Sequence, residues 1–132
     1  MADSKDMILL DSSVIIDFLR VKDKTKTWFY KLNSESQPLG ISIISLTELY
    51  AGKSTWEKPA AKIEIDIIIS GLQIISLTHD ISISAGKLRA DFNINALDAI
   101  VAQTAITSNS PLATLNSKHF KNIPHLKLLF QK

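Results

Sequence analysis

Short apolar runs alternate with segments of helical periodicity along this chain. Five runs favour strands because they are rich in aliphatic and β-branched residues: 7–10, 39–44, 73–77, 112–115 and 126–129. Segments 14–20, 25–33, 45–51, 58–70, 81–92 and 96–108 have the spacing of helices. The alternation predicts an α/β domain over residues 1–132. Its mostly parallel sheet of four to five strands would be covered by helices on both faces, as a three-layer α/β/α fold.

Two helical segments carry further expectations. Residues 25–33 place Trp28, Phe29 and Leu32 on one inward face. The stretch Ile63–Ile67 alternates with the period of a strand, but Pro59 suits the first turn of a helix and Gly71 suits its end. We therefore predict a helix over 58–70.

Composition removes several classes of protein. The chain has 132 residues, is 45% hydrophobic and contains no cysteine, so a core is expected without disulfides, thiolate zinc or a thiol nucleophile. This usage is compatible with a cytoplasmic location. No apolar run approaches the roughly 20 residues of a membrane span, so no membrane association is expected. A net charge of +2 is too small to indicate nucleic-acid binding by itself.

Three carboxylates stand where a predicted strand gives way to a helix. Asp11 follows the first strand, Glu48 lies early in the helix after the second, and Asp98 lies in the first turn of the Ala-rich helix 96–108. Right-handed crossovers bring such junctions to one edge of a parallel sheet. A cluster of acids repels itself unless a cation is present. We therefore expect a metal site suited to phosphate-ester chemistry.

Helix capping is the alternative explanation for each acid. Ser45-Leu-Thr-Glu48 has the spacing of a capping box, Asn95-Ala-Leu-Asp98 has the same spacing, and Asp11 could be an N-cap. In that case Ser45 begins a helix that Gly52 ends as a C-cap. Capping explains one acid at a time, and it does not explain why all three fall at the same edge.

Four segments resemble the ordered motifs of one family. They are Leu9–Leu19, Thr47–Gly52, Asp98–Ala105 and Leu112–Phe120. In this order they are similar to the motifs of PIN-domain ribonucleases, and especially to VapC-type toxins of toxin/antitoxin modules. Each motif is weak alone, but together they cover nearly the whole chain.

The resemblance implies a PIN-like fold and a metal-dependent endoribonuclease that acts as the toxin of a type II toxin/antitoxin module. Asp11 and Asp98 would hold Mg²⁺ or Mn²⁺, and Glu48 would bind a second ion or position water. Metal-activated water would attack a phosphodiester of cellular RNA. The implied partners are the RNA substrate, a cognate VapB-type antitoxin and a second copy of the chain in a homodimer.

The sequence departs from the family pattern after the fourth strand, where many relatives carry another acid. Here stand Thr114, Asn116 and His119. Asn116 is a candidate site residue that can bind a phosphate oxygen or a metal-bound water. Ser12 and Thr114 are candidates for holding the carboxylates by hydrogen bonds. His119 either contacts phosphate or only packs and caps a helical turn.

Two other interpretations stay open. The first is a phospho-receiver signalling module, which needs an acceptor aspartate after a central strand, whereas the strands 39–44 and 73–77 end in Ser45 and Thr78. The second is a catalytically weakened PIN domain that binds RNA or antitoxin, suggested by the missing fourth acid. Asp17 is expected to face solvent on the first helix.

Overall fold

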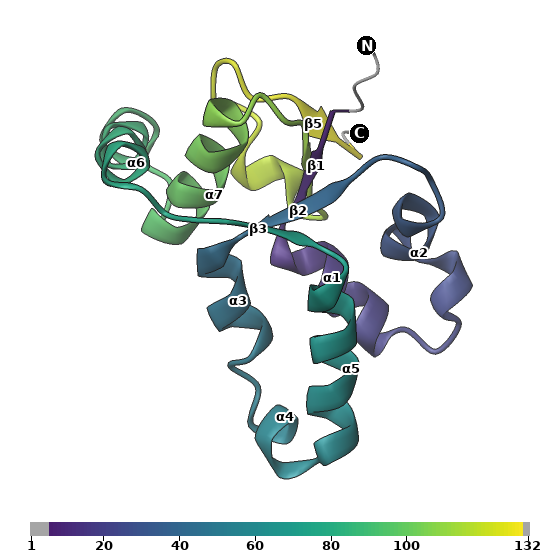
Figure 1. Cartoon of the computed structure of the whole chain (residues 1–132). Coiled ribbons are helices and arrows are strands. Elements are labelled where there is room, and N and C mark those ends of the chain that lie inside the picture. Colours follow the sequence, from purple (N-terminus) through teal and green to yellow (C-terminus); the bar gives the residue numbers. More distant parts are fainter. Residues whose placement is uncertain (1–5, 131–132) are drawn as a thin grey trace.

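Five parallel strands form the sheet in the computed structural model, which describes residues 6–130 (Figure 1). The strands are β1 (Ile8–Leu10), β2 (Leu39–Ser42), β3 (Gln73–Ile75), β4 (Leu112–Ala113) and β5 (Leu128–Leu129). Their spatial order is β3-β2-β1-β4-β5, and every neighbouring pair is parallel. The predicted parallel sheet is confirmed, although most strands are shorter than predicted. The ends of the predicted domain, 1–5 and 131–132, lie outside the described residues.

Helices follow the strands as expected. The α-helices are α1 (Ser12–Arg20), α2 (Trp28–Asn33), α3 (Ile43–Leu49), α4 (Lys53–Glu57), α5 (Pro59–Ser70), α6 (His79–Phe92) and α7 (Ala96–Thr107). Two 3₁₀ turns add to them, η1 (Lys24–Lys26) and η2 (Ser117–His119). No helix among the described residues is both long and apolar enough to span a bilayer.

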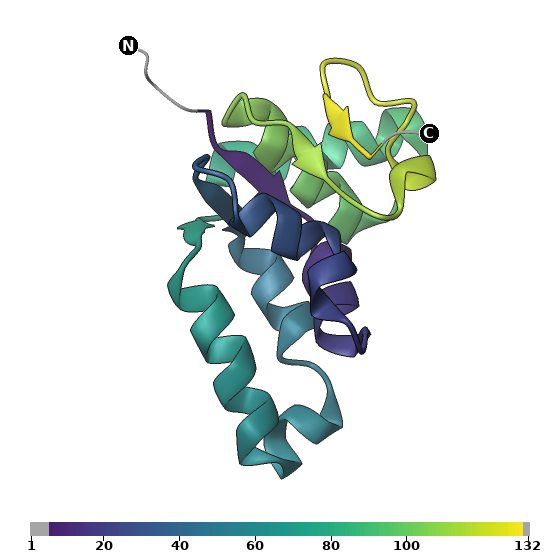
Figure 2. The same cartoon turned by 90° about the vertical axis from the view of Figure 1, so that its right-hand side faces the viewer.

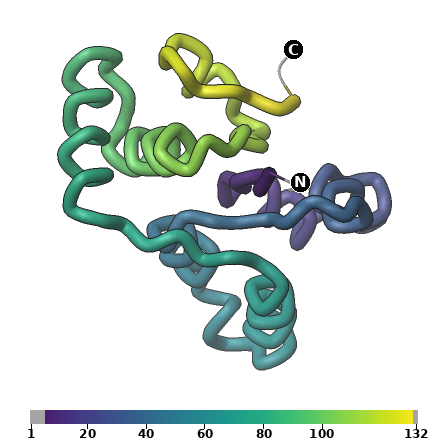
Figure 3. Tube along the Cα trace, turned by 45° about the horizontal axis from the view of Figure 1, so that its top comes forward, coloured from purple at the N-terminus to yellow at the C-terminus, as the bar shows by residue number. Residues whose placement is uncertain are grey.

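The sheet separates two hydrophobic cores, because successive side chains of a strand point to opposite faces. Ile8 and Leu10 of β1 pack with residues of α1, α2, α3 and α5. Leu9, between them, packs with α7 and with Phe120 after η2. Figures 2 and 3 show α5 on one side of the strands and α6 with α7 on the other. The three-layer α/β/α architecture is therefore confirmed.

The segment 58–70 is helical, as predicted. Pro59 occupies the first turn of α5, where its missing amide costs no hydrogen bond. The alternating isoleucines lie on two faces of this helix. Ile63 and Ile67, four residues apart, are exposed, and Ile65 between them is buried. Together with α4, which the periodicity did not predict, α5 forms an arm that extends from the sheet (Figure 1).

The single helix predicted over 25–33 is divided. Thr27 ends η1 and caps α2, because its hydroxyl accepts a hydrogen bond from the Tyr30 amide. Phe29 is buried as expected, but Trp28 is 38% exposed and stacks on Phe130 with ring centroids 4.1 Å apart. The prediction of an inward Trp28 is therefore wrong.

The capping box predicted at Ser45 is also wrong. Ser42 ends β2 with extended dihedral angles and its hydroxyl accepts from the Ile44 amide at 3.2 Å, so α3 begins at Ile43. Ser45 is then an interior, fully buried helix residue, and its Oγ has no hydrogen-bond partner among residues 6–130. At the other end, Tyr50 is the C-cap of α3, and Gly52 precedes α4 with a φ of −70°. Glu48 is thereby released from any capping role.

The topology fixes where ligands can gather. The chain runs from β1 outward through β2 and β3, then crosses to place β4 on the other side of β1. The carboxyl ends of β1 and β4 thus border the point at which the winding direction changes, which is the usual binding position in open α/β sheets.

Candidate functional site

A hollow of about 520 Å³ opens beyond the carboxyl ends of β1, β2 and β4. It is lined by Asp11, Ser12, Ser13, Ile16, Asp17, Arg20, Glu48, Asn95, Asp98, Leu115, Asn116 and His119. We refer to it as the acidic hollow, because four carboxylates lie in its lining. It contains all three acids singled out in the sequence, so the expected convergence is confirmed.

Asp11 forms the floor of the acidic hollow. It follows β1 directly, its backbone amide donates to the Ala113 carbonyl at 2.9 Å, and only 5% of the residue is exposed. Its Oδ2 accepts hydrogen bonds from Ser13 Oγ at 2.9 Å and Thr114 Oγ1 at 2.7 Å. The side chain makes no capping bond to α1, so the N-cap explanation does not hold for this acid.

A chain of hydroxyl contacts ties Asp11 to the end of β4. Thr114 is fully buried, and its Oγ1 accepts from the Asn116 amide at 3.0 Å. Ser13 Oγ accepts in the same way from the Leu115 amide at 3.1 Å. Each hydroxyl group thus accepts a hydrogen bond from a backbone amide and donates a hydrogen bond to the Asp11 carboxylate. The rotamer of Asp11 is thus fixed by one hydroxyl from the first turn of α1 and one from the residue after β4.

Glu48 reaches the hollow from α3, the helix that follows β2. Its Oε1 accepts from Ser12 Oγ at 2.9 Å. Partial burial raises the pKa of the Glu48 carboxyl group, and the nearby charges of Asp11 and Asp98 raise this pKa further, while the Ser12 bond works against both.

Asp98 enters from the first turn of α7, where capping is confirmed. Asn95 Oδ1 accepts from the Asp98 amide at 2.8 Å, and Asn95 Nδ2 donates to Asp98 Oδ2 at 2.9 Å. His119 Nδ1 lies 3.3 Å from the same Oδ2. Burial, then the charge of Asp11, raises the pKa of Asp98, while His119 and Asn95 lower it. Capping and site membership therefore coexist in one side chain.

The donor set fits a hard divalent cation. The charges of Asp11 and Asp98 oppose the ionisation of Glu48, and the charge of Asp11 opposes that of Asp98, so a cation held among the three carboxylates would offset the repulsion. Among the described residues, no three Asp, Glu or His side chains are drawn together into a closed metal-binding group. An open arrangement agrees with Mg²⁺, which prefers oxygen ligands, retains waters and completes its shell with substrate phosphate.

The remaining predicted residues are also present. Ser12 and Thr114 donate to Glu48 and Asp11, which confirms the expected hydrogen bonds. Asn116 lines the acidic hollow, at the position where relatives were expected to carry an acid. His119 contacts Asp98, so it does more than pack beside Phe120.

Sequence reasoning missed two charged residues of the acidic hollow. Asp17 was expected to face solvent, yet it lines the hollow with Arg20 and Ile16. The spacing from Ser13 to Ile16, Asp17 and Arg20 is three, four and seven residues, which places them on one face of α1. Arg20 gives this otherwise acidic lining a guanidinium group.

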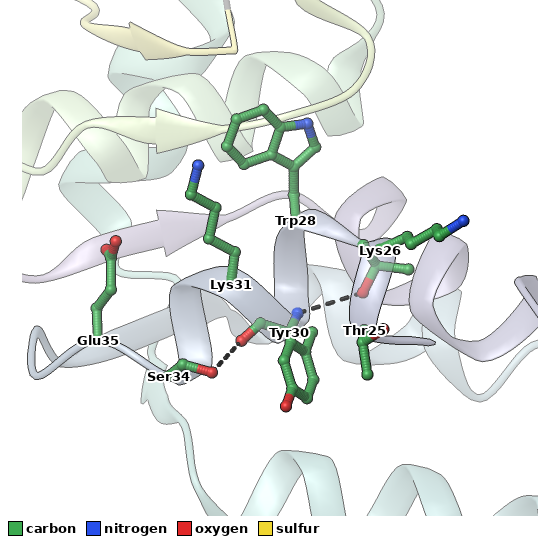
Figure 4. Close-up of a pocket in the computed structure, with 8 residues that line it drawn as sticks. Thr25, Lys26, Trp28, Tyr30, Lys31, Ser34 and Glu35 are labelled. Atoms are coloured by element: carbon green, nitrogen blue, oxygen red, sulfur yellow. Dashed lines mark hydrogen bonds between the residues drawn. The ribbon is translucent and has the colours of Figure 1, made fainter. Parts of the chain in front are cut away.

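Another hollow of similar size lies elsewhere on the described part of the chain. It measures about 630 Å³, follows α2 and contains none of the predicted site residues. Figure 4 shows Trp28 and Lys31 on one side of this helix and Tyr30 on the other. Lys31 Nζ lies 4.8 Å from the centre of the Trp28 ring, which already stacks on Phe130. The volume of a hollow therefore does not identify the one in which the acids converge.

Comparison with known proteins gives one consistent result. The PIN domain family model matches residues 8–126. Ribonuclease VapC10 of Mycobacterium tuberculosis is 32% identical over 126 residues, covering 92% of this chain and 91% of the relative. Ribonuclease VapC2 of Rickettsia felis is 34% identical over 104 residues, covering 74% and 78%. The crystal structure of VapBC2 from R. felis, bound to a DNA fragment from its promoter, superimposes with a TM-score of 0.77 at 27% identity, covering 93% of this chain and 97% of that one.

Proposed function

Because the chain belongs to the PIN domain family, and within it to the VapC ribonucleases, we propose that it is a metal-dependent endoribonuclease. It would act as the toxin of a type II toxin/antitoxin module and cleave phosphodiester bonds of cellular RNA. The observation that carries the proposal is the meeting of Asp11, Glu48 and Asp98 in one hollow, where burial and the charge of Asp11 raise the pKa of Glu48 and of Asp98.

The side chains of the acidic hollow would have different roles in the reaction. Asp11 and Asp98 would hold Mg²⁺ or Mn²⁺, with Asp11 fixed by two hydroxyl donors and Asp98 held by Asn95. Such an ion would activate water and offset charge on the phosphoryl oxygens. Ser12 holds Oε1 of Glu48, and we assign Oε2 of that carboxylate to orienting the attacking water.

Two neutral or cationic groups would serve the phosphate. Asn116, at the rim beyond β4, offers an amide donor without adding negative charge. Arg20, on the α1 side of the acidic hollow, offers a guanidinium group that suits phosphate oxygens. With these groups a polyanionic substrate can approach a centre that is itself acidic.

We also propose that a VapB-type antitoxin silences this chain and that two copies form a homodimer. The likeness to the R. felis VapBC2 structure supports the antitoxin as a partner. The arm formed by α4 and α5 exposes Trp56, Ile63 and Ile67, large apolar side chains that suit contacts with other proteins.

The decisive test compares the wild type with Asp11→Asn. With Mg²⁺, the wild type should cleave RNA and arrest growth when expressed. Asp11→Asn should lose at least about a hundredfold in cleavage rate, because loss of a metal ligand should exceed the 10–100-fold cost of disturbing an outer contact. Cleavage of an end-labelled RNA with Mg²⁺, and with chelator added, measures both effects.

Asp91→Asn is the matched control, since Asp91 is exposed on α6 and pairs with Lys87 at 2.6 Å. Circular dichroism establishes that both variants are folded. Undiminished cleavage by Asp11→Asn, or cleavage by the wild type in chelator, would refute the mechanism.

The absence of an acid in the segment after β4 favours one competing function, a PIN domain that binds RNA or antitoxin without cleaving it. A calorimetric titration separates the two, because absence of Mg²⁺ binding at millimolar concentrations would support the inactive protein. The phospho-receiver interpretation is set aside by the family match over residues 8–126.

A further inference from the structure

A second hollow, of about 340 Å³, adjoins the acidic hollow on the side of α6 and α7. Its lining consists of Phe92, Asn93, Ile94, Asn95, Asp98, Lys118, His119 and Asn122. We refer to it as the amide hollow, because three asparagines contribute to it. The two hollows share Asn95, Asp98 and His119, so their surfaces are continuous across these residues.

The two linings differ in charge. The acidic hollow has four carboxylates against one guanidinium group, that of Arg20, whereas the amide hollow has one carboxylate, the shared Asp98, against one ammonium group, that of Lys118. His119 lines both hollows. An RNA strand repelled by the acids would therefore find cationic and amide groups immediately beside them. The apolar side chains Phe92 and Ile94 add surface against which a base or sugar can pack.

The walls of the amide hollow are held in place by the fold. Asn93 ends α6 in the left-handed conformation, with a φ of 54°, and the turn to α7 takes only two further residues. Arg89 Nη1 donates to the Ile94 carbonyl at 2.6 Å, which fixes this turn. On the opposite wall, η2 is followed by Phe120 and Ile123, both buried in the core. The hollow thus exists before any ligand binds.

We propose that the amide hollow binds the RNA nucleotide adjacent to the phosphodiester that is cleaved. Lys118 contacts the backbone phosphate of that nucleotide, and Asn122 donates to or accepts from its sugar or base edge. The proposal rests on the proposed ribonuclease function and extends it, because it assigns substrate contacts to residues outside the predicted site.

The chemistry of the lining supports single-stranded RNA in particular. Unpaired bases expose edges that an amide can recognise, and the 2′-hydroxyl offers both a donor and an acceptor. Lys118 is exposed, so its ammonium group can reach a phosphate without prior desolvation. Phosphate contacts supply affinity, while amide contacts supply discrimination.

The test measures binding separately from cleavage. Fluorescence anisotropy with a short single-stranded RNA is recorded in an Asp11→Asn background and without metal, so that cleavage is suppressed in two ways. Adding Lys118→Ala should weaken binding roughly three- to tenfold and reduce the slope of log K against log salt by about 0.7, the value for one phosphate contact on a single strand. Adding Asn122→Ala should weaken binding without changing that slope.

Lys121→Ala is the matched control, because Lys121 is an exposed lysine three residues away that does not line the hollow. With the native Asp11 and Mg²⁺, Lys118→Ala should raise KM and leave kcat nearly unchanged. If Lys118→Ala and Asn122→Ala behave like Lys121→Ala while the wild type cleaves RNA, the amide hollow is not a subsite. If the wild type neither binds nor cleaves RNA, the proposed function fails together with it.

A modified substrate locates the contact. A neutral methylphosphonate is placed at one phosphate at a time next to the cleavage site. At one adjacent position the loss of affinity should match that of Lys118→Ala and should not add to it, since both changes remove the same interaction. Additive losses at every position would overturn the assignment of Lys118.

Discussion

Asp11 and Asp98 face the same hollow, but the protein holds them in different ways. Asp11 is 5% exposed and is gripped by hydroxyls of Ser13 and Thr114, one of them 103 residues away in sequence. The Asp98 side chain is 21% exposed and is held by Asn95, its own helix cap, and by His119 on a surface turn. Asp11 is held by hydroxyl groups from α1 and from the residue after β4, whereas Asp98 is held by a local cap and a partly exposed imidazole.

The difference indicates a division of labour. A buried, doubly bonded carboxylate keeps one rotamer, so it provides a stationary reference for a cation. A carboxylate at the rim responds to pH and to the group beside it. We therefore expect changes near Asp11 to remove function and changes near Asp98 to retune it.

Among changes to the groups that hold the two acids, removal of the Thr114 hydroxyl should have the largest effect on metal binding. Thr114→Val keeps the shape of the side chain but removes the donor to Asp11 and the acceptor for the Asn116 amide. Affinity for Mg²⁺ should fall by about 10–100-fold, as for other outer contacts of metal sites. Isothermal titration with Mg²⁺ measures this change.

Thr114→Ser retains the hydroxyl and serves as the control, so it should bind Mg²⁺ nearly as the wild type does. Loss of a buried hydrogen bond to a charged group should also lower the unfolding free energy of Thr114→Val by about 1.5–3 kcal/mol. Equal Mg²⁺ affinities for the two variants would show that the network does not position Asp11.

Glu48 and Asp98 should set the pH dependence of RNA cleavage. Burial and neighbouring acids raise the pKa of Glu48 and Asp98, so activity should decline with falling pH already above the range of ordinary carboxyl groups, about pH 4. His119 lowers the pKa of Asp98. His119→Gln should therefore raise that pKa and move the acid limb of the cleavage profile to higher pH.

His79→Gln is the control for this profile, since His79 is exposed and lies 3.6 Å from Asp80 at the start of α6. Its acid limb should coincide with that of the wild type. A limb that stays in place in His119→Gln would separate His119 from the titration of the site.

The smallest expected effect is on stability. In the metal-free protein, the pKa of Glu48 lies above its unfolded value, so ionising this group costs stability as pH rises through that range. Glu48→Gln removes the cost. Its melting temperature should exceed that of the wild type by a few degrees at pH 8 and should approach it near pH 3, well below the unfolded pKa of about 4.3, where the carboxyl group is protonated in both the folded and the unfolded state.

Addition of Mg²⁺ should raise the melting temperature of the wild type and close this gap at pH 8. Glu57→Gln, at an exposed pair with Lys53 on α4, should change neither value. A Glu48→Gln protein that is less stable at pH 8 would mean that the Ser12 bond outweighs the repulsion among the acids.

Local signals accounted for the successes of the sequence-based prediction. Asn95 and Asp98 are three residues apart, and the cap they form needs only the first turn of α7. The same spacing misled at Ser45 and Glu48, because Ser42, at the end of β2, provides the cap and starts α3 earlier. Both Ser42 and Ser45 could act as the N-cap of this helix. The spacing from Ser45 to Glu48 does not reveal that β2 ends at Ser42 and that the helix begins there.

The alternation of strands and helices, and the position of three acids at strand-to-helix junctions, could be predicted from the order of residues alone. These features depend on periodicity and on contacts within a few residues. The tertiary structure was needed to show that Thr114 donates a hydrogen bond to Asp11, that Ser12 donates one to Glu48 and that Arg20 lines the same hollow. Such contacts arise when crossovers bring distant junctions to one edge of the sheet, and no local spacing encodes which side chains then meet.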